Sequence, residues 1–236
     1  MDRAMDAVVT VDAAEHGLRR RPMQRRSAER YERILNVCAE LLDEAGYSNL
    51  TTTAVARRAG VPIGTVYQFF ADKNALVHAL AARNLQIYME RLSRRYETEE
   101  PTSLADVLGI AVDEFVDMRR TQPGFAVLDF GAGSKWNDGD PRDLYVLDAT
   151  VDNNTAVARR LRALTPILQG PGDSAELELA LRVTMEAADA VLQLAFRSDP
   201  DGDPALIAEC KKLLISYLGR YYPEQGSPTA GPRGGD

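Results

Sequence analysis

A hydroxyl and an amide side chain stand three residues apart on a short predicted helix that follows Pro62. Val66 and Phe70, four residues apart, form the apolar pair that is expected to face a core. Thr65 and Gln68 then lie on the opposite, outward face. A hydroxyl and an amide held outward on a short helix suit hydrogen bonds to base edges in a DNA major groove. Two further residues are predicted on that outer face or at its edge: Phe69 and Tyr67.

The preceding residues supply the elements that must position this helix. Thr51 is a suitable amino-terminal cap for a first helix, because its hydroxyl accepts from a free amide of the first turn. Gly60 is expected to end that helix, since glycine enters the left-handed conformation at little cost. Pro62 needs no amide donor where a second helix begins. Two short helices joined by a tight turn have the shape of a helix-turn-helix motif.

The segment from Ile34 to about Leu80 resembles the DNA-binding domain of the TetR family of transcriptional regulators. The matching residues follow one another at family spacing, behind a helix that ends in Ala45-Gly46-Tyr47. They are Ala59-Gly60-Val61, Gly64-Thr65-Val66-Tyr67, Phe70, and Lys73 followed by Leu76.

The resemblance implies a role for each residue of the motif. The amino end of the first helix is expected to meet the phosphate backbone through Thr51, Thr52 and Thr53. The residues expected to approach bases are Pro62, Ile63, Gly64, Thr65 and Gln68. Those expected over or beside phosphates are Tyr67, Phe69 and Lys73. Phe69 stands where the family frequently has Tyr or His and cannot hydrogen-bond a phosphate, so packing against a sugar or a thymine methyl is the alternative for it.

The charge distribution fits a nucleic-acid partner better than the net charge of −7 does. Residues 17–75 contain ten Lys/Arg against six Asp/Glu, a balance of +4. Residues 76–236 contain seventeen against twenty-five, a balance of −8. An acidic body with a mildly basic head can bind DNA through the head alone.

Five arginines crowd the segment before the first predicted helix: Arg19, Arg20, Arg21, Arg25 and Arg26. One interpretation is a solvated, positively charged tail. The other is an arm that lies on phosphates or enters a minor groove beside the recognition helix. The position directly before a DNA-binding domain favours the arm.

Composition argues against several other classes of protein. There is no glycine-rich phosphate loop, no Gly-x-Ser-x-Gly elbow and no His-Glu-x-x-His, so an enzyme is not expected. Two histidines and two well-separated cysteines offer almost no material for a metal site, and no cofactor is expected. Neither a membrane span nor an apolar signal-peptide core is visible, so we expect a cytoplasmic protein.

Helical periodicity predicts an all-α chain, with an amino-terminal three-helix DNA-binding domain and a carboxy-terminal helical domain for ligand binding and dimerisation. The predicted divisions are a flexible basic arm (1–26), the helix-turn-helix domain (27–74), the effector and dimerisation domain (75–222) and a disordered tail (223–236). Helices are expected over 27–45, 72–95, 103–120, 143–168, 175–197 and 204–222, besides the two of the motif. Asp72 is the expected cap of the second of these, Gln122-Pro123-Gly124 is expected to break the chain after the third, and the fourth is expected to be broken near Thr165-Pro166 at its end.

The resemblance also implies a small-molecule effector among the central helices. The short aromatic piece 125–130, between glycines, is the best pocket candidate, because broken helices leave space that regular packing would fill. The candidate lining residues are Phe115, Met118, Phe125, Leu128, Phe130, Trp136, Tyr145, Met185 and Asp189. The alternative place for most of them is the ordinary core.

The last two predicted helices have an apolar face wider than one neighbour needs. A two-fold four-helix bundle formed by two subunits would bury it, which predicts a homodimer. The alternative is an entirely intramolecular core. The residues expected at the interface are Leu192, Leu206, Leu213, Leu214, Tyr217 and Leu218.

These features together predict a one-component transcriptional regulator, with repression of a palindromic operator released by a small effector. An effector-independent DNA-binding or architectural protein of the same fold is the alternative. A helical enzyme or carrier is a third interpretation, and it would require the loss of operator binding.

Overall fold

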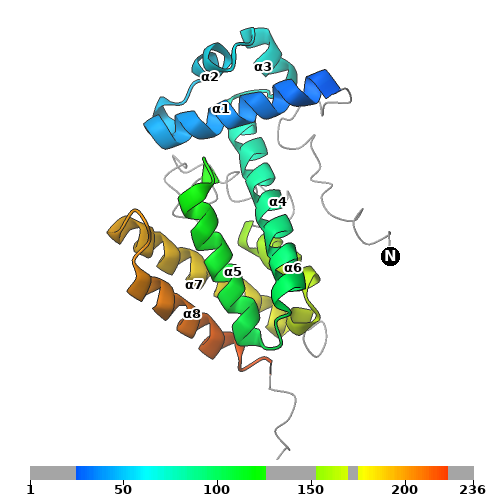
Figure 1. Ribbon diagram of the computed structural model, residues 1–236, viewed down its shortest axis with the longest axis vertical. Coiled ribbons are helices and arrows are strands. Elements are labelled where there is room, and N and C mark those ends of the chain that lie inside the picture. Colours follow the sequence, from blue (N-terminus) through cyan, green and yellow to red (C-terminus); the bar gives the residue numbers. More distant parts are fainter. Residues whose placement is uncertain (1–24, 126–152, 170–174, 223–236) are drawn as a thin grey trace, which may run out of the picture.

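The computed structural model describes residues 25–125, 153–169 and 175–222, and every regular element within these ranges is helical (Figure 1). The all-α prediction is therefore confirmed. The elements are α1 (Arg25–Asn49), α2 (Thr52–Ala59), α3 (Ile63–Phe69), α4 (Lys73–Glu99), α5 (Leu104–Thr121), α6 (Asn153–Leu164), the 3-10 helix η3 (Pro166–Gln169), α7 (Ala175–Ser198) and α8 (Pro204–Leu218).

The helix-turn-helix forms as the local signals predict. Thr51 has an extended backbone, and its hydroxyl accepts from the amide of Ala54 at 3.1 Å. Gly60 ends α2 in the left-handed conformation, with φ of 65°. Pro62 then precedes the first residue of α3. Because each cap satisfies backbone groups that the short helices leave open, the turn between them is held by local chemistry.

The first helix is longer than its predicted range. It begins at Arg25, two residues before the predicted start at residue 27, and it extends to Asn49 rather than ending near residue 45. Gly46 lies inside this span with φ of 72° and ψ of 171°, so the helix is kinked there. The chain therefore leaves helical geometry at the predicted end, Ala45-Gly46, and then continues as a short helical segment to Asn49.

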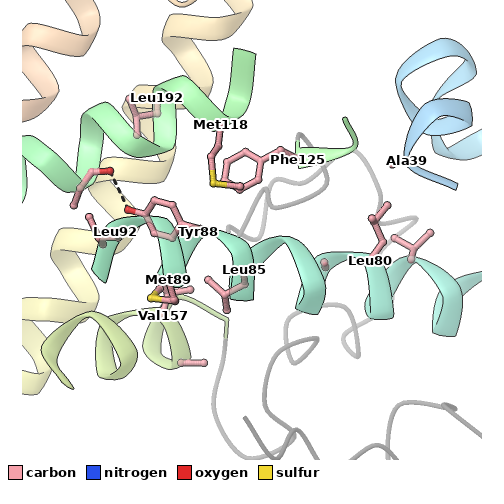
Figure 2. Close-up of a cluster of buried hydrophobic side chains, with 14 of the residues drawn as sticks. Ala39, Leu80, Leu85, Tyr88, Met89, Leu92, Met118, Phe125, Val157 and Leu192 are labelled. Carbon is pink, nitrogen blue, oxygen red and sulfur yellow. Dashed lines mark hydrogen bonds between the residues drawn. The ribbon is translucent and has the colours of Figure 1, made fainter. Parts of the chain in front are cut away.

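Helix α4 connects the head, formed by α1, α2 and α3, to the body, formed by α5, α6, α7 and α8 (Figure 1). Asp72 caps it as predicted, because its Oδ1 accepts from the amide of Ala75 at 2.8 Å. The helix then continues to Glu99. Leu80 lies towards Ala39 of α1, whereas Tyr88 lies deep in the body (Figure 2). One helix therefore contributes to the cores of both parts, and the predicted boundary at residue 74 falls inside its first turn.

In the body, α5 packs on α4 and α7 packs on α8. Ser103 and Asp106 form a capping box at the start of α5, in agreement with the predicted start at residue 103. The buried hydroxyl of Tyr88 donates to the carbonyl of Ala111 at 2.9 Å and ties α4 to α5 (Figure 2).

In the body, the break predicted near Thr165-Pro166 is present, whereas the last helix ends before its expected end. The expected helix over 143–168 is described only from residue 153, and α6 ends at Leu164, before the short 3-10 helix. Pro166 explains that end, because proline disfavours helical geometry in the residue before it. The last helix ends at Leu218, four residues short of its expected end, where Gly219 caps it.

Candidate nucleic-acid interface and effector cavity

Helix α3 presents a mixed polar and apolar face to the surface. Ile63 and Tyr67 are 39% and 42% exposed, and Gln68 is exposed, whereas Val66 is completely buried. Thr65 is partly exposed. The outward placement of this face and the inward placement of Val66 and Phe70 agree with the sequence prediction.

The helix is braced from the side by a contact that the sequence did not reveal. The Tyr67 hydroxyl lies 3.2 Å from Oγ1 of Thr52, within hydrogen-bond distance. Tyr67 thereby links α3 to the first turn of α2. Of the other predicted backbone-contacting residues, Thr51 and Thr53 are exposed and Thr52 is partly exposed.

Phe69 does not lie on the outer face, so its predicted contact with DNA is wrong for this arrangement. Its side chain is only 3% exposed, and its ring meets Tyr31 of α1 edge-on at 5.6 Å. The prediction extended regular helical spacing to Phe70, but α3 ends at Phe69 and Phe70 has an extended backbone. Both phenylalanines therefore turn into the core and anchor α3 on α1.

Lys73 lies at the start of α4, half-buried against the end of α1. Its Nζ is 3.9 Å from the centre of the Tyr47 ring and donates to the Tyr47 carbonyl at 3.3 Å. The Tyr47 hydroxyl in turn bonds to the side chain of Asn74. Lys73 therefore has a structural role, and its contact with a phosphate stays a prediction.

The remaining motif residues leave α3 open to a large partner. Pro62 and Gly64 are exposed, and outside its chain neighbours and the backbone of α3 no heavy atom of the described residues lies within 4 Å of the position where Gly64 would carry a Cβ. Arg25 and Arg26 at the start of α1 are also exposed, and Arg25 pairs with Glu29 at 3.2 Å. Arg19, Arg20 and Arg21 lie outside the described residues.

An apolar cavity lies in the body between α4, α5, α6, α7 and α8. Three predicted pocket residues line it: Phe115, Met185 and Asp189. The sequence did not assign the other lining residues to a pocket, because an inward helical face has the same apolar spacing whether it meets a neighbouring helix or a cavity. They are Tyr88, Leu108, Ala111, Val112, Val157, Leu161, Thr184, Ala188, Leu192 and Leu214.

The cavity is small, and its few polar groups are engaged. Its volume is about 60 Å³, far below the roughly 300–1,000 Å³ of a typical ligand pocket. The Asp189 carboxylate accepts from Nε2 of Gln193 at 2.8 Å, and the Thr184 hydroxyl donates to the Ala180 carbonyl at 2.7 Å. A drug-sized ligand therefore requires the surrounding helices to move apart.

Two other predicted pocket residues belong to the packed core. Met118 and Phe125 are fully buried between α4 and α5, and neither lines the cavity (Figure 2). The Phe125 ring lies 5.3 Å from Phe115 and 6.3 Å from Tyr88. The other predicted pocket residues lie outside the described residues: Leu128, Phe130, Trp136 and Tyr145.

Three predicted dimer residues are buried within the subunit, so their assignment to an interface is wrong. Leu192, Leu214 and Leu218 are at most 4% exposed, and the first two line the cavity. Leu206 and Tyr217 are partly exposed, and Leu213 is 46% exposed. The wide apolar face of the last two helices is thus largely covered by the subunit itself.

Four large apolar side chains stay exposed on α7 and α8 and are here together called the apolar stripe. Its members are Leu179, Val183 and Leu194 of α7 and Leu213 of α8, which are 60%, 41%, 42% and 46% exposed. Along α7 these residues stand four and eleven positions apart, so they share one face of the helix. The sequence prediction missed all three α7 residues, because periodicity does not tell a core face from an interface.

Besides the continuous chain of α4, two polar contacts join the head to the rest of the protein. The Arg83 guanidinium of α4 donates to Oδ1 of Asn36 on α1 at 2.7 Å. After α5, the amide of Gly124 donates to Oδ2 of Asp43 on α1 at 2.9 Å. Helix α1 is therefore held by both α4 and the end of α5.

The two buried cysteines, Cys38 and Cys210, are poorly suited to act as nucleophiles. Burial raises the pKa of the Cys38 thiol to about 12 and that of Cys210 to about 11, so both stay protonated at neutral pH. The described ranges contain no cluster of three or more His, Cys, Asp or Glu side chains that would hold a metal ion. In the same ranges, no helix has the length and apolar character needed to cross a membrane.

Two family models match this chain. Residues 34–80 match the model described as bacterial regulatory proteins, tetR family, and residues 102–222 match the tetracyclin repressor-like C-terminal domain. The chain belongs to the TetR family. Members of this family are DNA-binding transcriptional regulators rather than enzymes, in agreement with the sequence prediction.

A TetR-family regulator from Streptomyces coelicolor is similar over most of the chain. Its crystal structure has a TM-score of 0.67 and 40% sequence identity, and the match covers 81% of this chain and 99% of that one. FadR from Bacillus subtilis, solved with stearoyl-CoA, has a TM-score of 0.57 at 15% identity, over 80% of this chain and 97% of that one, and shares the fold.

The HTH-type transcriptional regulator YvdT of Bacillus subtilis is 30% identical over 92 residues. That alignment covers 39% of this chain and 46% of the relative, so the chain spans about half the length of this curated relative.

Proposed function

We propose that this TetR-family protein is a homodimeric repressor whose heads bind a palindromic operator and whose bodies bind a small-molecule effector that releases the DNA. The observation that carries the proposal is the outward face of α3, with Tyr67 and Gln68 exposed while Val66, Phe69 and Phe70 anchor the helix on the head. A firmly anchored helix with a free polar face suits docking in a major groove.

Within this proposal, Gln68 and Thr65 read base edges. Tyr67 is braced by Thr52 and lies at the edge of the same face, where it suits a phosphate contact. The exposed Arg25 and Arg26 at the start of α1 add charge that any DNA sequence attracts. Sequence preference therefore comes from α3 and general affinity from its surroundings.

The experiment starts by selecting bound fragments from genomic DNA of the source organism and then footprinting the operator. On that operator, Gln68→Ala is expected to cost about 1–3 kcal/mol and to relax preference at one base pair. Gln86→Ala is the matched control, because Gln86 is an exposed glutamine on α4 whose amide donates to Glu90. Equal weakening of operator and random DNA by Gln68→Ala would contradict the base-reading role.

The effector part of the proposal rests on the apolar cavity. Because the cavity is small as it stands, an effector must stabilise a state in which the helices around it are further apart. Such a ligand shifts the population towards that state by its difference in affinity for the two states. Repression is released if the two heads of the enlarged state no longer fit the operator.

The dimer part rests on the exposed apolar stripe of α7 and α8. Large exposed apolar side chains that share one face of a helix suit an interaction site. A two-fold axis through this stripe would form a four-helix bundle from two copies of α7 and α8. The two heads then reach successive half-sites of one operator.

A further inference from the structure

A groove of about 410 Å³ lies on the outer side of α6 and α7, separate from the apolar cavity. Its walls come from two helices that pack against each other. Three arginines and one glutamate carry the charge of its lining: Arg159, Arg162, Arg182 and Glu178. The remaining lining residues are small or apolar, apart from one threonine: Thr155, Ala158, Ala175 and Leu181.

Hydrogen bonds orient two of these arginines, Arg159 and Arg162. Arg159 donates to Oε1 of Glu178 through Nε at 3.2 Å and Nη2 at 2.6 Å. Arg162 donates from Nη2 to the carbonyl of Gln169 on η3 at 2.9 Å. Guanidinium groups that are already oriented lose less conformational entropy when a ligand binds.

The charge of the groove runs against that of the body around it. Residues 76–236 carry a net charge of −8, yet the charged lining residues are three cations and one anion. A solvated surface of this body would be expected to show the opposite balance. The volume also lies within the range of small-molecule pockets.

We propose that this groove binds a phosphorylated small molecule, with Arg159, Arg162 and Arg182 contacting its phosphate oxygens. The planar fork of a guanidinium matches the spacing of phosphate oxygens, and several forks around one groove suit more than one negative charge. The apolar floor formed by Ala158 and Leu181 accommodates the part of the ligand that carries the phosphate.

The test is isothermal titration of the full-length protein at low ionic strength with three probes: pyrophosphate, octyl phosphate and octanol. One saturable site per chain is expected for a phosphorylated probe and none for octanol. Tighter binding of octyl phosphate than of pyrophosphate assigns the groove to a phosphorylated amphiphile. The reverse order assigns it to a soluble phosphate compound.

The variants separate the groove from general electrostatics. The Arg159→Gln/Arg182→Gln double variant is expected to weaken phosphate binding by about tenfold or more, as loss of charge-assisted hydrogen bonds does. The Arg197→Gln/Arg220→Gln variant removes the same charge from exposed positions outside the lining, and a change below about twofold is expected. Arg182→Gln alone keeps the Arg159–Glu178 pair and serves if the double variant fails to fold.

Equal losses in the groove and control variants would overturn the proposal, as would the absence of saturable binding by both phosphorylated probes. The titration needs neither operator nor dimer. A negative titration would therefore not contradict the proposed repressor function, and a loss of operator binding would not contradict phosphate binding in the groove.

Discussion

Gly124 is the position where one added methyl group would test how the head is joined to the body. Its φ is +67°, a left-handed conformation that side chains rarely adopt. A Cβ at this position would lie 2.8 Å from Cβ and 2.9 Å from Cα of Ala39 on α1, and 3.1 Å from Cδ2 of Leu80. Carbon atoms in contact prefer about 3.5–4.0 Å, so alanine would force α1 away from the end of α5.

The expected cost of Gly124→Ala has two parts. A residue with a side chain costs about 1–2 kcal/mol in the left-handed conformation. Overpacking a tight contact costs about 1–3 kcal/mol, and here the neighbour is the backbone of a helix rather than the end of a flexible side chain. The free energy of unfolding should therefore fall by about 2–5 kcal/mol, a large share of the roughly 5–15 kcal/mol of a typical protein.

The measurement is urea denaturation followed by far-ultraviolet circular dichroism at one protein concentration. Gly109→Ala is the matched control, because Gly109 lies within α5 and, apart from its chain neighbours and the backbone of its own helix, no heavy atom of the described residues stands within 4 Å of the place that its Cβ would take. In a helix interior alanine is favoured over glycine by about 1 kcal/mol, so the control should gain stability. A Gly124→Ala protein within about 0.5 kcal/mol of wild type, or an equally destabilised control, would refute the reasoning.

Three further predictions concern other parts of the molecule. If the proposed dimer forms through the apolar stripe, Val183→Glu with Leu213→Glu should give folded monomers with weak operator binding, measured by sedimentation and gel shift. Ala208→Glu, at an exposed position of α8, is the control, and a double variant that stays dimeric would place the interface elsewhere. Asn84→Leu should raise the free energy of unfolding by about 1–3 kcal/mol, because both amide atoms of Asn84 are buried and neither has a hydrogen-bond partner among the residues that the structure describes. A lower urea midpoint for this variant would show that the amide is needed. Iodoacetamide should leave the thiols of Cys38 and Cys210 unlabelled at pH 8 until urea is added, and rapid labelling of the native protein would contradict this. Because the pKa of each thiol is raised in the folded state, the free energy of unfolding should fall as the pH rises above about 9, where the thiols of the unfolded chain ionise.

The head was predictable from sequence because its signals are local. Thr51, Gly60 and Asp72 each fix a helix end through their own side chain or backbone, and all three do so in the structure. Phe69 was misplaced because its direction depends on where α3 stops, and element ends are set within one or two residues by packing. The ring of Tyr31, more than thirty positions earlier in the chain, provides the contact that decides it.

In the body, the helices were predictable but their partners were not. The spacing of Leu192, Leu214 and Leu218 marks an apolar face correctly, yet the same spacing serves a core, a cavity wall or a dimer interface. The distinction depends on which helix covers the face in three dimensions. The exposed residues of α7 were missed for the same reason, since Leu179 and Val183 have the same residue types as core positions and differ from them in their exposure.

The residues that join the head to the body are even further apart in the sequence than Phe69 and Tyr31. Gly124 and Asp43 are separated by 81 positions, and neither residue type signals the other. The Gln-Pro-Gly sequence predicted a break after α5, but the close approach of Gly124 to Ala39 follows only from the way α1 crosses the end of that helix.

A continuous set of packed groups leads from the cavity to the head. Phe115 lines the cavity and its ring contacts that of Phe125, which directly follows Gly124. Gly124 in turn meets Ala39 and bonds to Asp43 on α1. Gly124 and Ala39 are in close contact, and packed groups of this kind leave little free space between them. A movement of Phe115 that enlarges the cavity is therefore expected either to displace α1 or to separate one of these packed groups from the next.

This arrangement gives Gly124→Ala a second expected effect besides lower stability. A variant that loosens α1 from the end of α5 should still bind the operator through an intact α3, while an effector changes its affinity less than it changes that of the wild type. Packed neighbours alone do not establish coupling between two sites, so the difference in effector response is the decisive measurement. An unchanged response in a destabilised Gly124→Ala protein would assign the coupling to α4 and its Arg83–Asn36 contact instead.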